Sequence, residues 1–254
     1  MSISPNETLW QKHKVAMLAV TPMPITVHIK TAQPSPILDN LVAKWRDEKN
    51  MPFPESDLTL RMFGAKSLET IGNVITIHGC PVSWGQYMTM RKYFSIIPEE
   101  EQFLQVAVSC LIETSDQHLI LSFRSKNVAT HKNMWHVSAA GGAMLSSIQS
   151  SRGFLFSIFT EIDEELNLTP IHISSVTQLG LYRHTGEDSA NIEVCFLATT
   201  KISSKEVLTR AKDAKDTWEG KISTFPRDEV RRMIYTETFN PAGAATIITA
   251  LRLS

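Results

Sequence analysis

The stretch FTEIDEELNL, residues 159–168, carries four carboxylates, Glu161, Asp163, Glu164 and Glu165, near the end of a helical pattern. At about 100° per residue, Glu161, Glu164 and Glu165 share one helix face, whereas Asp163 points elsewhere. Like charges at these spacings disfavour a helix, and the helix dipole disfavours anions near the C-terminal end. The face is either a solvated acidic surface or a site where a divalent cation offsets both penalties. We favour a metal site made by these three glutamates, with Mg²⁺ or Mn²⁺ as the cation.

The helix that positions these carboxylates is predicted from about Ser151 to Leu166. Its apolar residues recur at helical spacing and predict one buried face: Leu155, Ile158, Phe159, Ile162 and Leu166. The runs FLQVAVSCLIE and QHLILSFRS predict strands before it, joined as a hairpin, and VTQLGLYRH and NIEVCFLATT predict strands after it. SSKEVLTRAKDAKDTWEG is read as helical, and Asn240 with Pro241 is typical of the start of a last helix. Because the alternation lacks the regular period of a doubly wound fold, we expect an α/β fold with a mixed sheet between helices.

The first hundred residues have a different pattern. Short strand-like runs surround one helical stretch, SPILDNLVAKWRDEKN, and predict a small β-rich N-terminal domain with one helix. A proline and a run of glutamates in FSIIPEEEQ are typical of a junction. We therefore expect two units, residues 1–100 and residues 101–254.

The composition and the net charge argue against some classes of binding partner. The chain has 254 residues, is 43% hydrophobic and carries a formal net charge of -1, so no global field draws it to nucleic acid or to an anionic membrane. No signal-peptide pattern and no membrane-spanning apolar run is visible, which predicts a cytoplasmic protein. The three cysteines lie in apolar runs and are predicted to be buried free thiols.

A longer motif surrounds the acidic helix. GGAMLSSIQSSRGFLFSIFTEIDEELNL, preceded by HLILSFRS and MWHVSAA, resembles the Nudix hydrolase family, whose box reads G-x5-E-x7-R-E-U-x-E-E-x-G-U with U aliphatic. The R-E-U-x-E-E core matches Glu161, Glu164 and Glu165, and the resemblance implies that these glutamates bind the metal. It also implies a Nudix-type α/β/α sandwich over the second unit. A backbone carbonyl of Gly141 or Gly142 is implied as a further ligand, and we choose Gly142.

The implied reaction is attack of a metal-activated water on the diphosphate of a nucleoside diphosphate derivative. The family places its general base variably, and the candidates here are Glu165, Glu187 in RHTGEDSAN, and Glu219 in AKDTWEG. We assign catalytic roles to Glu165 and Glu219. Glu219 is preferred among the loop glutamates because its segment, with Trp218, resembles the corresponding segment of several divergent Nudix proteins.

Positive charge for the phosphates is expected from loops near the glycine pair. The cationic candidates are Arg124, Lys126, Lys132 and Arg183. We choose Arg124, Lys132 and Arg183 for substrate binding, and Arg124 foremost because its strand leads into the glycine loop. The histidines in the same region, which can donate to phosphate or act as a base, are His131, His136 and His184.

The N-terminal unit suggests a substrate. LDNLVAKWRDEKN, LTLRMFGA and WGQYMTMRKYF weakly resemble the N-terminal extension of Nudix proteins that hydrolyse UDP-glucose and related sugar nucleotides. This implies a nucleotide sugar as one substrate class. An aromatic cluster either lines a base or sugar pocket or forms the core of the small domain: Trp84, Tyr87, Tyr93 and Phe94. The family resemblance also implies a homodimer as one option for the assembly.

Three positions depart from the box. Thr160 stands where the box has arginine, Arg152 where it has its first glutamate, and Asn167 where it has the closing glycine. Asn167 can still adopt the left-handed conformation that ends a helix. The missing arginine and glutamate favour an alternative, a Nudix-fold protein that is inactive or repurposed and binds a nucleotide-like ligand. The three glutamates favour the hydrolase, which is our prediction.

Overall fold

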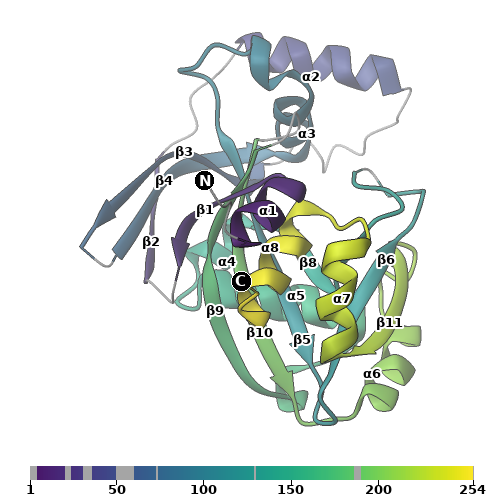
Figure 1. The fold of residues 1–254 in the computed structure, drawn as a ribbon. Coiled ribbons are helices and arrows are strands. Elements are labelled where there is room, and N and C mark those ends of the chain that lie inside the picture. The colour runs from purple at the N-terminus through teal and green to yellow at the C-terminus, as the bar shows by residue number, and fades with distance from the viewer. Residues whose placement is uncertain are drawn as a thin grey trace.

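The structure is a computed structural model that describes residues 5–20, 24–30, 36–49, 60–72, 74–128, 130–185 and 190–253. Its helices are α1 (Pro5–Lys12), α2 (Pro36–Lys49), α3 (Trp84–Tyr93), α4 (Leu145–Gln149), α5 (Phe154–Leu166), α6 (Ser204–Arg210), α7 (Arg227–Thr236) and α8 (Pro241–Leu251). Its strands are β1 (Val15–Val20), β2 (Ile25–Ile29), β3 (Leu60–Ile71), β4 (Val74–Ser83), β5 (Leu104–Glu113), β6 (His118–Arg124), β7 (Trp135–Val137), β8 (Ala139–Gly142), β9 (Ile173–His184), β10 (Asn191–Thr200) and β11 (Gly220–Pro226). Figure 1 shows their arrangement.

The described strands form one mixed sheet. Its main path runs β1-β9-β10-β5-β3-β4-β2, while β6 joins β5 to β11 and β7, and β8 pairs with β5. The pairs β10–β5 and β2–β4 are parallel, and the other pairs are antiparallel. The expected α/β fold with a mixed sheet is confirmed, and so is the hairpin of β5 and β6.

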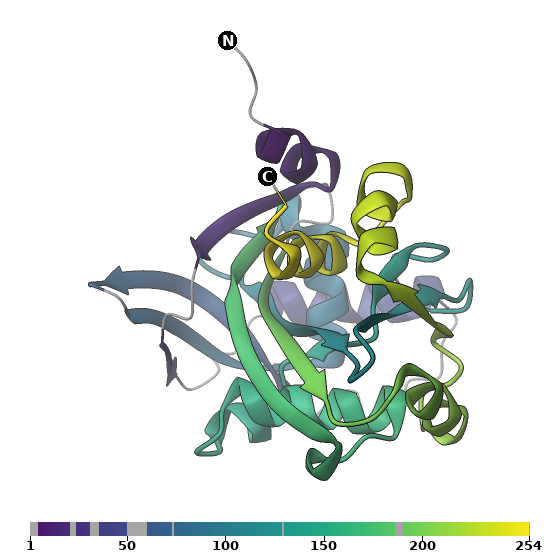
Figure 2. The ribbon, with the colours of Figure 1, turned by 60° about the horizontal axis from the view of Figure 1, so that its bottom comes forward.

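Alternation along β5 gives the sheet its two covered faces. Val106, Val108, Cys110 and Ile112 belong to the same core cluster as Ile158, Ile162 and Leu166 of α5. Leu111, which points the other way, clusters with Ala244, Ile247 and Ile248 of α8. Figure 2 shows α5 and α8 on opposite sides of the central strands. Each large aliphatic side chain contributes roughly 1.5–3 kcal/mol to the stability of the fold when it is fully buried. The apolar layer between α5 and β5 therefore holds α5 against the sheet.

Helix α5 starts later than the sequence pattern predicts. Gly153, with φ of 51°, precedes the helix, which begins at Phe154 after the separate short helix α4. The expected burial of Leu155 is wrong, because its side chain is 39% exposed whereas Phe154 is 7% exposed. Phe154 lies four residues before Ile158 and so completes the buried stripe. Asn167 ends the helix with φ of 54° and ψ of 42°, which confirms the predicted left-handed stop.

The segment after β10 differs most from prediction. The stretch read as one helix contains α6, a short 3-10 turn at Ala211–Asp213, and a loop that leads into β11. Neither β11 nor α7 was predicted. The last helix is confirmed, because the Asn240 side chain accepts a hydrogen bond from the backbone N–H of Ala242 at 2.8 Å.

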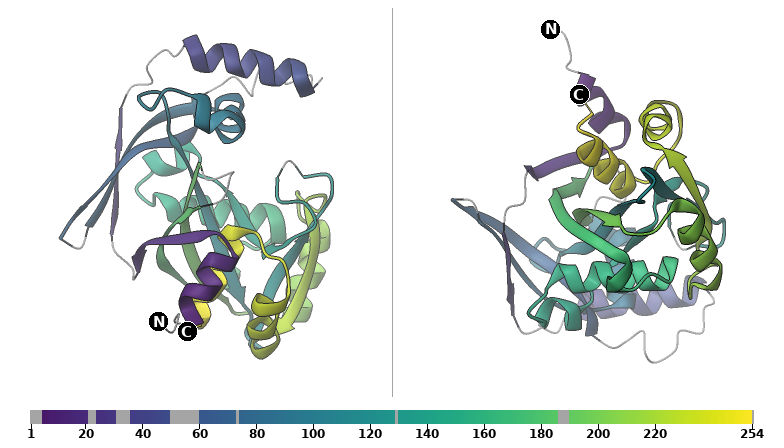
Figure 3. Two further views of the ribbon diagram at one scale, coloured as in Figure 1. Left: turned by 45° about the horizontal axis from the view of Figure 1, so that its top comes forward. Right: turned by 90° about the horizontal axis from the view of Figure 1, so that it is seen from below.

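The two expected units share one sheet. Strand β3 pairs with β5 through Gly64–Gln105 and Ala65–Leu104, and β1 pairs with β9 along its length. In Figure 3, α2 and α3 lie together at one end, over β3 and β4, and α1 lies beside the end of α8. The first unit was expected to hold one helix, but α1, α2 and α3 all lie in it. The boundary near residue 100 stays a prediction, but hydrogen bonds of the sheet cross it.

The described helices include none with the length and apolar character needed to cross a membrane. Cys110 and Cys195 are buried free thiols, as expected, and Cys80 is a half-buried free thiol. Burial raises the pKa of the Cys195 thiol to about 12, which keeps it protonated at neutral pH.

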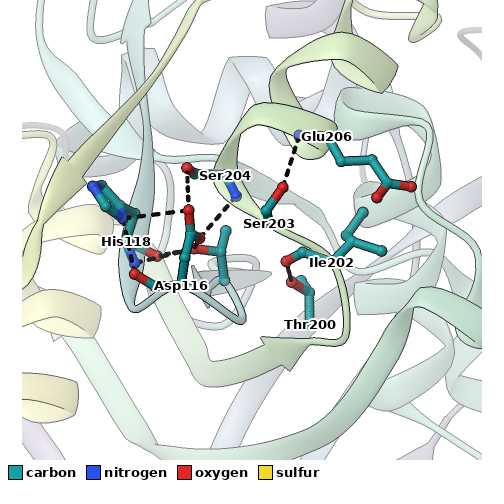
Figure 4. Close-up of polar contacts among 8 residues, drawn as sticks. Asp116, His118, Thr200, Ile202, Ser203, Ser204 and Glu206 are labelled. Atoms are coloured by element: carbon teal, nitrogen blue, oxygen red, sulfur yellow. Dashed lines mark hydrogen bonds and ion pairs between the residues drawn. The ribbon is translucent and has the colours of Figure 1, made fainter.

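The turn between β5 and β6 is tied to the start of α6 by Asp116 (Figure 4). Its carboxylate accepts from the Ser204 N–H at 2.9 Å and from the Ser204 hydroxyl at 2.7 Å. The Thr114 hydroxyl donates to the same carboxylate at 2.5 Å. These hydrogen bonds, that from Thr114 first, hold the pKa of Asp116 well below its usual range.

Replacing Asp116 by asparagine is expected to lower the free energy of unfolding by about 1 kcal/mol, because the amide nitrogen cannot accept from Ser204. In a chain of this size that is roughly a 2–4 °C lower Tm at pH 7. Since the folded pKa is depressed, the stabilisation is present at neutral pH and is lost as pH falls through that lowered pKa. Thermal unfolding at pH 7 measures the first effect, and a series of falling pH values below 4 measures the second. Asp213→Asn, at an exposed position in the 3-10 turn, is the control. Equal Tm values for wild type and Asp116→Asn at pH 7 would contradict the capping role.

Candidate active site

A cleft of about 330 Å³ opens where β8, the start of β10, α3 and the loop before β11 meet. Its polar lining includes Glu161 from α5, Glu193 from β10 and Glu219 from the loop before β11. Arg91 and Arg124 lie in the same wall. The cleft therefore places carboxylates and guanidinium groups from five separate segments within one small volume.

Two of the three predicted ligands on α5 face β8. The Glu161 carboxylate lies directly against Gly141, where an added side chain would occupy its place. Glu165 is buried, and its Oε1 accepts a hydrogen bond from the Ala140 N–H at 3.0 Å. Glu165 lines the neighbouring cavity of about 410 Å³, and Glu219 lines both cavities. The short strand β8 thus holds both carboxylates at the boundary between the two cavities.

The third predicted ligand, Glu164, pairs with a lysine, although its charge still raises the pKa of Glu161. Glu164 Oε1 lies 3.3 Å from Lys215 Nζ, which also lies 3.9 Å from Asp163 Oδ2. Within the described residues, no three His, Cys, Asp or Glu side chains converge closely enough to hold a metal ion. For all three glutamates to share one cation, Glu164 has to leave Lys215.

The buried carboxylates have raised pKa values. Burial first, and then repulsion from Glu164, Glu219 and Asp216, raises the pKa of Glu161 to about 8. Burial and the nearby Glu161 raise the pKa of Glu165 well above its usual range. Both groups would be more stable as anions beside a cation. Oxygen-only donors are also what Mg²⁺ and Mn²⁺ prefer, so the chemistry of the residues fits such an ion.

Glu219 and Arg124 form an ion pair at the cleft. Arg124 Nη1 lies 3.5 Å from Glu219 Oε2, and the side chains are 14% and 27% exposed. The Ser125 N–H donates to the Glu219 carbonyl at 2.7 Å, which fixes the loop to the end of β6. Burial raises the pKa of Glu219, although Arg124 opposes the shift. A carboxylate with a raised pKa that faces a cleft is suited to accept a proton.

Sequence reasoning missed Glu193 and Arg91. Glu193 is 3% exposed on β10, and burial raises its pKa to about 8, with the positive charge of Arg91 opposing the shift. A charged residue inside the otherwise apolar run NIEVCFLATT was the available signal. Arg91 lies on one face of α3 with Trp84 and Tyr87, at helical spacing, and all three line the cleft.

Two buried polar atoms in the cleft have no partner among the described residues: Nε2 of His184 and Oδ1 of Asn191. The two residues are 4% and 5% exposed. Burial lowers the pKa of His184 to about 3, so its ring is neutral at pH 7. Unsatisfied buried polar atoms are rare in proteins, and here they mark positions where a ligand can bind.

Of the remaining predicted residues, some line the cleft and others do not. Gly142 lines it, as does His131, whereas Lys132 is exposed and Arg183 is half-buried on β9, and neither contributes to the lining. Trp84 and Tyr87 stack with ring centroids 5.6 Å apart and line the cleft, but Tyr93 and Phe94 do not. Glu187 lies outside the described residues. Thr160, in place of the box arginine, donates to the Phe156 carbonyl of its own helix at 3.0 Å.

Adding a methyl group at Gly141 tests the position of Glu161. Gly141→Ala is expected to displace the Glu161 carboxylate, and any activity of the cleft is expected to fall about 10²-fold, because misplacement by about 1 Å costs that much. Gly142→Ala is the comparison, since its methyl would press on the end of the Met62 side chain and not on a carboxylate. Turnover and Mn²⁺ affinity are measured for both variants. Equal losses in the two would contradict a specific role for Glu161.

No family model matches the sequence, and no curated protein sequence matches it. The chain is similar in fold to solved Nudix structures. One is Tm1382, described as a candidate Nudix hydrolase, with 14% identity and a TM-score of 0.47 over 76% of this chain and 100% of that chain. The NUDIX domain of Shewanella oneidensis NrtR, solved in complex with ADP ribose, has 15% identity and a TM-score of 0.44 over 64% of this chain and 97% of its own. The MutT protein from Methanosarcina mazei Go1 has 15% identity and a TM-score of 0.35 over 58% of this chain and 92% of its own. These similarities concern the fold alone, and the roles of the cleft residues rest on their own geometry.

Proposed function

We propose that the chain is a divalent-metal-dependent pyrophosphohydrolase that cleaves the diphosphate of a nucleoside diphosphate derivative, with a nucleotide sugar as one substrate class. One observation carries the proposal: Glu161, Glu219 and Arg124 line a single cleft, and Glu165 accepts a hydrogen bond from Ala140 N–H beside it. Carboxylates that destabilise one another and face guanidinium groups suit a ligand that combines a cation with phosphate oxygens.

Glu161 and Glu165 are the residues that would hold Mg²⁺ or Mn²⁺, joined by Glu164 after it leaves Lys215 and by a carbonyl of the glycine pair, for which Gly142 is our choice. A bound cation of this kind supplies charge for the phosphate oxygens and lowers the pKa of a water. The hydrogen bond from Ala140 orients Glu165, as groups around a metal ligand commonly do.

The other cleft residues bind the substrate and move the proton. Arg124 and Arg91 can donate to phosphate oxygens. Glu219 accepts the proton of the attacking water, the new P–O bond forms, and the anhydride P–O bond breaks with its electron pair on the departing phosphate. Trp84 and Tyr87 offer a stacked aromatic surface for a base or a sugar. Lys132 and Arg183 stay predicted phosphate contacts outside the lining.

A second function is favoured by one contact. Glu164, the third ligand, forms a 3.3 Å ion pair with Lys215 and is not among the described residues that line the cleft. If that pair persists with ligand bound, the chain is a Nudix-fold protein that binds a nucleotide-like molecule without cleaving it.

One experiment separates the two functions. The full chain is incubated with Mg²⁺ or Mn²⁺ and nucleotide sugars, dinucleotides or nucleoside triphosphates, and products are followed by ³¹P NMR. We expect a metal-dependent phosphate product from at least one class, and a loss of about 100-fold or more in Glu165→Gln. Asp163→Asn, on the exposed side of the same helix, is expected to stay within twofold of wild type.

The other outcomes would reject either the hydrolase or the assigned site. No metal-dependent product from any class would reject the hydrolase and support binding alone. If Glu165→Gln cleaves as fast as wild type, the hydrolase stands and the assigned site is wrong.

A further inference from the structure

A second cavity, of about 440 Å³, adjoins the cleft between the α1–β1 turn and the segment that joins α7 to α8. Its lining includes Lys12, His13 and Lys14 from the turn. His131 and His184 line this cavity and the cleft alike. The two cavities therefore meet at a wall made of two histidines.

The lining is predominantly cationic. Lys12 Nζ donates to the carbonyls of Ile234, Tyr235 and Glu237 at 3.3, 2.7 and 3.4 Å, which fixes its charge at the cavity. Lys14 is exposed and makes no ion pair with the described part of the chain. Glu237 is the only carboxylate among the described lining residues. Two ammonium groups thus face one carboxylate in a partly enclosed space.

His184, in the wall that the two cavities share, gives a second sign of a ligand. It is 4% exposed, and its Nε2 has no hydrogen-bond partner in the described structure. A neutral ring can donate or accept at this atom, according to its tautomer. Leaving such a buried atom unpaired is unfavourable, so a bound group that pairs with it stabilises the fold.

Neighbouring groups fix the positions of the two histidines in the wall between the cavities. The rings of His131 and His184 lie with centroids 6.3 Å apart and planes at 73°. His131 Nε2 lies 3.1 Å from Arg91 Nη2, and its backbone has a φ of 52°. A positive φ is uncommon for a residue other than glycine, so the loop presents this ring at some conformational cost.

We infer that this second cavity binds a phosphoryl group, held by Lys14, by the fixed charge of Lys12 and by Nε2 of His184. Its volume of about 440 Å³ lies within the usual range of small-molecule sites, roughly 300–1,000 Å³, so it accepts more than a bare phosphate. The phosphoryl group has two sources: a second phosphate on a substrate in the cleft, which rests on the proposed function, or a separate phosphorylated molecule.

Binding of inorganic phosphate to the metal-free full chain, in the presence of a chelator, tests the site directly. Titration calorimetry is expected to give at least fivefold weaker binding for Lys14→Gln and for His184→Gln than for wild type. Lys205→Gln, at an exposed position on α6, is expected to bind as wild type does, and Arg124→Gln shows how much of the signal comes from phosphate bound in the cleft. Circular dichroism confirms folding, and the exposed Lys14 keeps the test decisive if His184→Gln is unstable. Unchanged affinity in Lys14→Gln, or loss in Arg124→Gln alone, would overturn the inference.

A kinetic experiment distinguishes the two sources of the phosphoryl group. If the substrate supplies the group, a 2′-phosphorylated nucleoside diphosphate derivative has a higher kcat/KM than its parent, and Lys14→Gln removes the difference. If a separate molecule supplies it, phosphate changes turnover of the parent in wild type and not in Lys14→Gln. Should no substrate be cleaved, the proposed function fails, and the metal-free titration still decides the inference.

Discussion

Replacing Glu161 by glutamine is expected to stabilise the metal-free chain at pH 8 while removing its response to divalent cations. Because the folded pKa of Glu161 is raised to about 8, against an ordinary value of 4.5, the folded state holds the proton more tightly than the unfolded state. The resulting stability is present below the ordinary value and is lost as pH rises through about 8. Glutamine stays neutral throughout and avoids that loss.

The magnitude of this effect is on the order of a few kcal/mol, since each unit of pKa shift corresponds to about 1.4 kcal/mol. Thermal unfolding with a chelator at pH 5, 6.5 and 8 measures it, and Asp163→Asn is the control on the same helix. At 100 times Kd, Mg²⁺ or Mn²⁺ is expected to stabilise wild type by about 2.7 kcal/mol, and Glu161→Gln far less. A variant that unfolds at the wild-type temperature at pH 8 without metal, or that gains equally from metal, would contradict the assignment of Glu161.

Replacing Glu219 by glutamine is expected to lower kcat by about 10²–10⁴-fold, the usual contribution of a general base. KM is expected to change little, because the loss of the 3.5 Å ion pair leaves Arg124 available to the phosphates. Steady-state kinetics across pH 5–9 measures kcat and KM, and also the limb of the pH–rate profile that the general base controls. Glu206→Gln, where the exposed carboxylate pairs with Arg210 at 3.2 Å, is the control.

A rise in KM with an unchanged kcat in Glu219→Gln would assign Glu219 to substrate binding. Glu165, the other predicted catalytic residue, would then be the next candidate for the base.

Local periodicity predicted much of the framework. Helix α5 and its buried stripe follow from a 3.6-residue repeat, and the strands β5, β6, β9 and β10 follow from apolar runs bounded by polar turns. The stop at Asn167 and the cap at Asn240 depend only on neighbouring residues. Interactions of this kind are encoded within a few positions, so the sequence alone reveals them.

Long-range contacts decided what the sequence could not show. Glu164 shares a helix face with Glu161, but Lys215, 51 residues away, pairs with it. Arg91 and Glu193 reach the cleft because α3 and β10 meet there, which depends on the order of strands in the sheet. Helix geometry fixes which side chains point the same way, whereas tertiary packing fixes which of them meet a partner.

The predicted burial of Leu155 was wrong for a related reason. The apolar stripe could begin at residue 154 or 155, and the position of Gly153 before the helix, with φ of 51°, accompanies the first choice. Strand β11 was missed because GKISTFP is short and polar on one side, and only its pairing with β6 identifies it.

The central claim is that water attacks a phosphoric anhydride in this cleft. The most direct measurement is turnover of a nucleotide sugar or dinucleotide with Mg²⁺ or Mn²⁺ in ¹⁸O-labelled water, with products weighed by mass spectrometry. We expect one ¹⁸O atom in one phosphate product per turnover, only with metal, and none above background in Glu161→Gln. Intact substrate with metal, for every substrate that the protein binds, would contradict the account.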